Sequence, residues 1–162
     1  MTPQELVKHK QAPKRLIALP TFKGMSKSAK KPKPFHKMGG IRYQWTEIQA
    51  VSDIHRIVFI WRNGELRTDT AFFAYLFFAL QNGELYPLTE FHLHPSHKGG
   101  HMKVPCETQY DYTERFLPGA PELKISGVGQ LDPRLEKDRD ILIARFCYAV
   151  GIKTGKDNGL WN

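Results

Sequence analysis

An uninterrupted apolar run near the middle of the chain constrains the fold more than any other feature. All ten residues of Ala71–Leu80 are apolar, and a run of this size belongs in a protein core. It is too short to span a bilayer, which takes about 20 residues. The run is apolar on nearly all sides, Asp69 or Thr70 can cap its start, and Asn82-Gly83 follows as a stop signal. We therefore predict a buried central helix, with a buried strand as the alternative.

Strand signals flank this run on both sides. Arg56–Arg62 is rich in β-branched and aromatic residues, and Asn63-Gly64 separates it from Glu65–Asp69. Asn-Gly between two such segments is the strongest short signal for a β-hairpin. Two further strands are predicted at Leu88–His94 and His101–Cys106, and they would form a second hairpin.

A second helix is predicted near the C-terminus. Asp132 followed by Pro133 is typical of a helix start, and Gly151 is a suitable end. The predicted fold is α+β: an antiparallel sheet built from two β-hairpins, with a buried central helix and a C-terminal helix, preceded by an extended basic N-terminal arm. The predicted divisions are the arm, 1–45, a single α+β domain, 46–151, and a C-terminal tail, 152–162.

The positive charge of the chain lies in the arm. The net charge is +8, but residues 1–45 contain eleven basic side chains and one acidic one, so the rest of the chain is slightly acidic. The arm also contains five prolines. Repulsion between lysines and the geometry of proline disfavour a packed core, so an extended or irregular arm is predicted. The basic residues are Lys8, Lys10, Lys14, Arg15, Lys23, Lys27, Lys30, Lys31, Lys33, Lys37 and Arg42.

A dense run of lysines neutralises phosphates and releases counterions, which favours nucleic acid as the partner. We predict a nucleic-acid-binding protein, with RNA favoured over DNA, that works with other protein subunits in a larger nucleoprotein assembly. A protein-binding module for an acidic partner is an alternative. The aromatic side chains of this region either stack on bases or anchor the arm to the domain; they are Phe22, Phe35, Tyr43 and Trp45.

The remaining composition favours a cytoplasmic protein with no membrane partner. Leu16–Leu19, the first apolar stretch, is too short for the core of a signal peptide. Cys106 and Cys147 are far apart in the sequence and match neither a metal-ligand spacing nor a disulfide framework.

Four histidines within ten residues form the strongest candidate site; they are His92, His94, His97 and His101. Side chains alternate between the two faces of a strand. In the second predicted hairpin, one face therefore holds Glu90, His92, His94, His101 and Lys103. The other face holds Phe91, Leu93, Met102 and Val104. We expect His94 to lie nearly opposite His101.

Three interpretations of this polar face remain open. Two imidazoles and an ammonium can perform metal-independent RNA cleavage as general base, general acid and charge stabiliser. The candidate catalytic residues are His92, His94, His101 and Lys103. A second interpretation is a metal site. A third is a polar sheet face that is merely rich in histidine or that contacts phosphate directly.

The segment from His92 to His97 resembles the His-x-His-x-Asp-His metal motif of the metallo-β-lactamase family. The resemblance covers six residues. Ser96 stands in place of the Asp, and the later ligands of that family have no counterpart after His101. We therefore predict no metal ion and no other cofactor.

Overall fold

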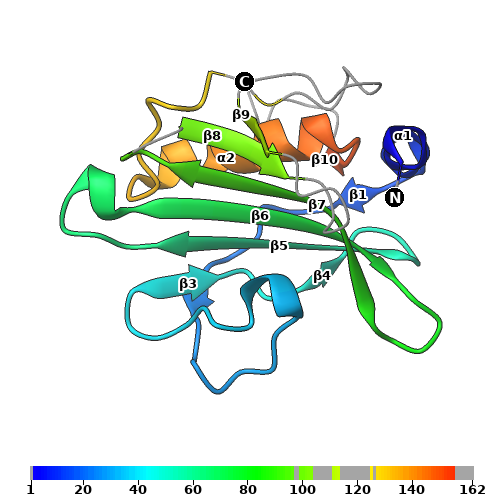
Figure 1. Cartoon of the computed structure of the whole chain (residues 1–162), viewed down its shortest axis with the longest axis horizontal. Coiled ribbons are helices and arrows are strands. Elements are labelled where there is room, and N and C mark those ends of the chain that lie inside the picture. Colours follow the sequence, from blue (N-terminus) through cyan, green and yellow to red (C-terminus); the bar gives the residue numbers. More distant parts are fainter. Residues whose placement is uncertain (1, 97–98, 104–110, 114–124, 126, 156–162) are drawn as a thin grey trace.

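A single large antiparallel sheet organises the α+β fold of the computed structural model (Figure 1). The structure describes residues 2–96, 99–103, 111–113, 125 and 127–155. The sheet order is β2-β3-β5-β6-β7-β8-β9, and β4 pairs with β5 beside this path. The strands are β2 (Lys23–Gly24), β3 (Tyr43–Trp45), β4 (Gln49–Ala50), β5 (His55–Arg62), β6 (Ala71–Ala79), β7 (Leu85–His94), β8 (Gly99–Lys103) and β9 (Asp111–Thr113).

The helices lie outside the sheet. They are α1 (Pro3–Gln11) and α2 (Glu136–Ala149), with two short 3-10 helices, η1 (Lys33–Phe35) and η2 (Arg67–Asp69). A separate pair of short parallel strands, β1 (Arg15–Leu16) and β10 (Lys153–Thr154), joins the N-terminal region to the segment after α2. Within the described residues, no helix is long and apolar enough to cross a membrane.

The apolar run is strand β6, so the prediction of a buried central helix is wrong. β6 pairs antiparallel with β5 on one side and with β7 on the other. Phe72 and Leu76 pack into the core beneath α2, whereas Phe73 and Tyr75 pack into a second core on the opposite face. A central strand that is covered on both faces needs apolar residues at every position, so it loses the alternation by which strands are recognised.

Each face of the sheet has its own core. On the helix face, Leu142 and Phe146 of α2 and Leu6 of α1 join the sheet residues, and α2 lies behind the sheet in Figure 1. On the other face, Met25 and Phe35 from the segment 23–40 cover the strands. We call this side the loop face and the segment 23–40 the lysine loop.

The N-terminal region begins with a helix and packs on the rest of the domain, which the prediction of an extended or irregular arm did not include. α1 begins with a capping box in which Thr2 and Glu5 bond to each other's backbone. Leu6, Leu16 and Phe35 are each 4% exposed or less. The region is held by isolated apolar anchors at wide intervals, and composition averaged over residues 1–45 does not reveal such anchors.

The connection between β5 and β6 is longer than the predicted Asn-Gly turn. The strands pair as far as Arg62 and Ala71, and the residues between Gly64 and Ala71 form a bend and η2 in place of a strand. Gly64 is required here because a Cβ atom at this position would lie 2.5 Å from the Asp69 side chain.

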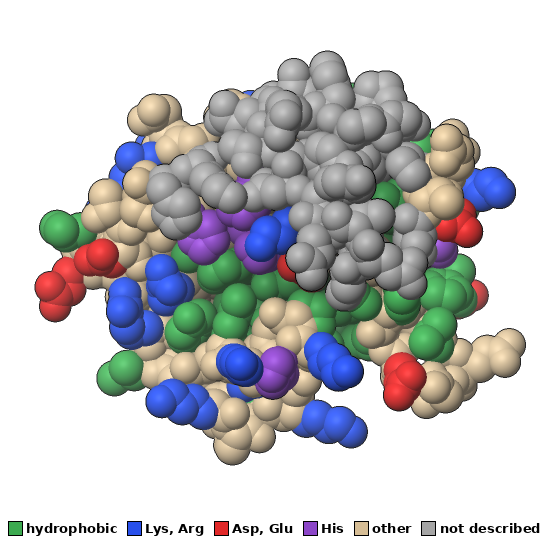
Figure 2. Space-filling model, in the orientation of Figure 1, with side chains coloured by type: hydrophobic (Ala, Val, Ile, Leu, Met, Phe, Trp, Pro, Cys, Tyr) green, Lys and Arg blue, Asp and Glu red, His purple; other side chains and the backbone are tan. Residues whose placement is uncertain are grey.

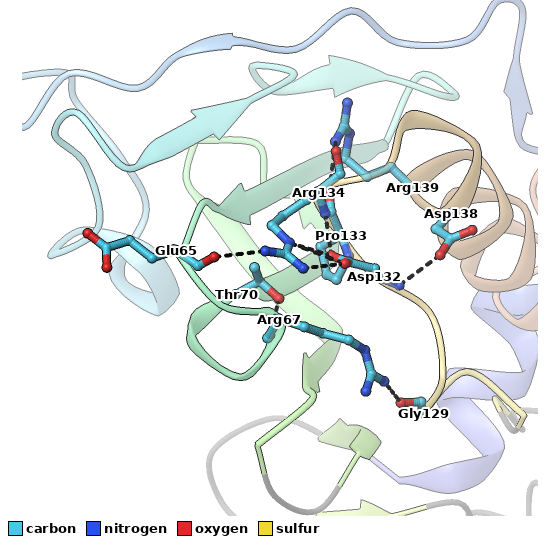
Figure 3. A network of polar contacts seen from close by, with 9 residues as sticks. All are labelled: Glu65, Arg67, Thr70, Gly129, Asp132, Pro133, Arg134, Asp138 and Arg139. Atoms are coloured by element: carbon cyan, nitrogen blue, oxygen red, sulfur yellow. Dashed lines mark hydrogen bonds and ion pairs between the residues drawn. The ribbon is translucent and has the colours of Figure 1, made fainter.

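Polar contacts tie this connection to the start of α2 (Figure 3). Arg134 donates to the Glu65 carbonyl oxygen at 2.9 Å and pairs with the Asp132 carboxylate at 2.8 Å. Asp132 forms a turn before α2 and does not cap it, since the helix begins at Glu136. Gly151 follows the helix with φ of +70°, as expected for a glycine that ends a helix.

Candidate functional site

The predicted alternation of β7 and β8 is confirmed over the described residues. Phe91 and Leu93 are fully buried in the core beneath α2, and Met102 belongs to the same core. His92 and His94 lie on the loop face, where both contact Phe73. Val104 and His97, which the sequence analysis also considered, lie outside the described residues.

The register differs from the expected one. His92 pairs with His101, Glu90 pairs with Lys103, and Gly99 stands opposite His94. The reason is that β8 begins at Gly99, earlier than the predicted start at His101. His94 therefore reaches His101 diagonally across the hairpin.

This register brings three imidazoles together, and we call His92, His94 and His101 the histidine cluster. The ring centroids of His92 and His101 are 5.3 Å apart, those of His94 and His101 are 5.6 Å apart, and those of His92 and His94 are 5.9 Å apart. Each ring offers one nitrogen such that the three atoms lie within 4.8 Å of one another. The three rings thus form a triangle in which each can share a ligand with the other two.

The surroundings of the cluster are mostly apolar. Phe73 of β6 contacts both His92 and His94, at centroid distances of 5.1 and 5.5 Å. His101 is only 4% exposed. Among the described residues, an acidic group is also present, because Glu90 Oε2 lies 3.2 Å from His92 Nε2.

The sequence analysis does not predict the aromatic side chains that contact the histidine cluster. A helix over the apolar run does not predict that Phe73 and Tyr75 contact His92. Burial, followed by the nearby Glu90 charge, raises the pKa of the Tyr75 hydroxyl. The alternative prediction, a strand over this run, places both residues on the same face and so could have indicated these contacts.

Two glycines shape the hairpin end beside the cluster. Gly99 has φ of +61°, a conformation that favours glycine. At Gly100, a Cβ atom would clash with Val128 Cγ2 and lie 3.1 Å from the Phe91 ring, both of which belong to the helix face. Paired glycines are common in turns, but Gly100 is needed for close packing within the strand.

The basic residues of the N-terminal region do not all face solvent. Lys14 is only 3% exposed, and it donates to the carbonyl oxygens of Lys10, Ala12 and His9 at the end of α1. Burial, followed by the charge of Lys10, lowers the pKa of Lys14 to about 8. The ammonium group of Lys14 therefore binds the carbonyl oxygens at the end of α1 and is not part of the candidate nucleic-acid surface. Lys10 and Lys31 are half-buried, and the exposed members are Lys8, Arg15, Lys23, Lys27, Lys30, Lys33, Lys37 and Arg42.

Phe35 fastens the lysine loop to the loop face. It is 1% exposed and its ring contacts Tyr75 at a centroid distance of 5.0 Å. Tyr75 also contacts His92, at 5.8 Å. Lys33 and Lys37, which precede and follow Phe35 in the lysine loop, are both exposed. One buried tyrosine therefore links the lysine loop to the histidine cluster.

The loop face is shown in Figure 2. Several histidine side chains lie near the upper part of the described surface, and lysine and arginine side chains gather along its lower part, where a further histidine lies among them. Apolar side chains lie between these two groups. Phe35 and Trp45 are buried, so these two aromatics anchor the region in this structure.

Comparison of the chain with protein-family models, curated proteins and solved structures finds no significant match.

Proposed function

We propose that the protein binds nucleic acid on the loop face, with RNA favoured over DNA. The observation that carries this proposal is the packing of Tyr75 against both Phe35 and His92. It joins a group of exposed lysines to a group of imidazoles on one side of one sheet. Ammonium groups neutralise RNA phosphates, and imidazole N–H groups donate to phosphate or base oxygens.

Protein groups neutralise little of the charge of the lysine loop. In the part of the chain that the structure describes, the ion pairs join Lys23 to Glu47, His92 to Glu90 and Arg134 to Asp132. Lys23 is thus the member of the loop that has an acidic partner there. The ammonium groups of Lys30, Lys33 and Lys37 have no such partner among the described residues and can contact an external anion.

Fluorescence anisotropy with labelled single-stranded RNA across a salt series tests the proposal. The test variant replaces Lys30, Lys33 and Lys37 by Gln. A slope of about −0.7 per phosphate contact in log K against log[salt] applies to single strands. If all three lysines contact phosphates, the slope should become shallower by about 2, and the affinity at 0.1 M salt should fall roughly 100-fold.

The matched control removes the same charge from the other side of the protein. Lys8, Lys137 and Lys153 are exposed and lie on α1, α2 and β10. Their replacement by Gln should leave the slope nearly unchanged. Equal losses in the two triple variants would contradict a defined surface, and no RNA binding by the wild type would overturn the proposal.

Binding of poly-glutamate in place of RNA would support the acidic protein partner instead. Single-stranded DNA of the same sequence measures the preference for RNA.

Metal-independent RNA cleavage is the second candidate, because the histidine cluster lies beside Lys103, which follows His101 on β8. The same RNA incubated in EDTA tests it. Loss of a general acid or base costs about 10²–10⁴ in rate, so His94→Ala and His101→Ala should each abolish most cleavage. Intact RNA after incubation with the wild type would remove this candidate and leave RNA binding unaffected.

A further inference from the structure

The spacing of the histidine cluster is close to the spacing that a metal ion requires. A zinc–nitrogen bond is about 2.0–2.1 Å, so two nitrogens of a tetrahedral site lie about 3.3 Å apart. The three candidate nitrogens lie within 4.8 Å of one another without any ion. Rotation of the imidazole rings has to bring the nitrogens closer by up to about 1.5 Å before all three can bind one ion.

We propose that His92, His94 and His101 bind a divalent transition-metal ion of the zinc class. Three imidazoles are a ligand set that suits Zn²⁺, Cu²⁺ or Ni²⁺, and it does not suit Mg²⁺ or Ca²⁺, which require oxygen ligands. Three protein ligands with water in the fourth position are typical of catalytic zinc sites.

The strands hold the ligands in place. His92 and His101 are paired across β7 and β8, and His94 follows His92 on the same face. Because both strands belong to the large sheet, the ligand backbones are fixed before metal binds. A rigid arrangement of this kind lowers the cost of ordering the ligands.

Glu90 supplies a further element of a metal site. Its Oε2 atom lies 3.2 Å from His92 Nε2. A carboxylate beside a ligating imidazole orients the ring and raises its basicity. In this arrangement Glu90 is a positioning residue for His92.

The structure also explains why the sequence motif is a poor guide. The resemblance requires His97 as the next ligand and an Asp at position 96. The register of the hairpin instead provides His101 from the paired strand. The absence of an Asp at position 96 therefore argues against the motif, but it does not argue against metal binding by the histidine cluster.

Isothermal titration tests the site in full-length protein purified without a His-tag, treated with EDTA and then dialysed free of it. Zn²⁺ should bind with one equivalent per chain. His94→Ala should weaken binding by more than about 100-fold, since loss of a residue that merely supports a ligand already costs about 10–100-fold. Glu90→Gln should weaken it by about 10–100-fold. Co²⁺ should give the visible absorption of a tetrahedral complex in the wild type and not in His94→Ala.

His36→Ala is the matched control, because His36 is an exposed histidine on the lysine loop. It should bind zinc like the wild type. Far-UV circular dichroism checks that each variant is folded, and His92→Gln replaces His94→Ala if the latter does not fold. Absence of one-equivalent binding in the wild type, or full binding in the folded cluster variant, would overturn the proposal. No RNA is present, so this result is independent of the proposed function.

Discussion

Acidification is expected to destabilise the protein through His55. This side chain is fully buried at the start of β5. Burial, followed by the positive charges of Lys14, His9 and Arg56, lowers the pKa of His55 from 6.5 to about 4. Burial also lowers the pKa of His9.

The hydrogen bonds around His55 favour its neutral form. Ser52 Oγ accepts from the backbone N–H groups of Ile54 and His55, at 3.3 and 3.0 Å. Its hydroxyl hydrogen is then directed to His55 Nδ1, 2.8 Å away. We therefore assign the proton of His55 to Nε2, which lies 3.0 Å from His9 Nδ1 and would donate to it. A second proton on Nδ1 would oppose the serine hydroxyl hydrogen.

The sign and size of the effect follow from these pKa values. Between pH 6.5 and about pH 4 the unfolded state binds a proton at His55 that the folded state does not, so the free energy of unfolding falls as the pH falls. Above pH 6.5 this histidine contributes almost no pH dependence. One pKa unit corresponds to about 1.4 kcal/mol, so the loss between about pH 7 and about pH 4.5 should be roughly 2–3 kcal/mol.

Urea denaturation of the wild type and His55→Gln at about pH 7 and about pH 4.5 measures this loss. Gln cannot titrate, so the variant should lose roughly 2–3 kcal/mol less than the wild type on acidification. His36→Gln, which changes an exposed histidine, should behave like the wild type. An identical pH dependence in all three proteins would refute the assignment to His55.

Two substitutions test the packing on the helix face. Phe91→Ala should lower the free energy of unfolding by about 3–5 kcal/mol, because the ring is fully buried against Phe72 and Phe146. Gly151→Ala should cost at least about 2 kcal/mol, since φ is +70° and a Cβ atom would clash with the Lys10 carbonyl oxygen. Urea midpoints check both, and an unchanged midpoint in either variant would contradict the packing described for that residue.

The part of the site that is predictable from sequence is the part fixed by local geometry. Alternation within a strand places His92 and His94 on one face whatever the partner strand does. The cross-strand partner depends on where β8 begins, and nothing in the sequence indicates that Gly99 already belongs to the strand. The expected contact of His94 with His101 exists, but as a diagonal one.

The helix predicted over Ala71–Leu80 is wrong because burial on two sides removes periodicity. A strand covered on one face alternates, and an amphipathic helix repeats every 3.6 residues, but β6 is apolar at each position. Its four phenylalanines and one tyrosine favour a strand. This composition is a better guide than the length of the run and its flanking residues, on which the helix prediction depends.

The folded state of the lysine-rich region has a consequence for its function. Lysines on an extended arm would follow an RNA chain and lose conformational freedom on binding, at a cost in free energy. Here Met25 and Phe35 are buried on the loop face, so the lysines between and beside them start from a fixed backbone. If the protein binds RNA as proposed, the phosphate spacing of the bound strand has to match the spacing of these lysines. Deleting residues 1–40 would remove these anchors and expose both cores, so a loss of binding in the deletion variant could result from unfolding. Point substitutions of exposed lysines leave the anchors in place and therefore test binding separately from folding.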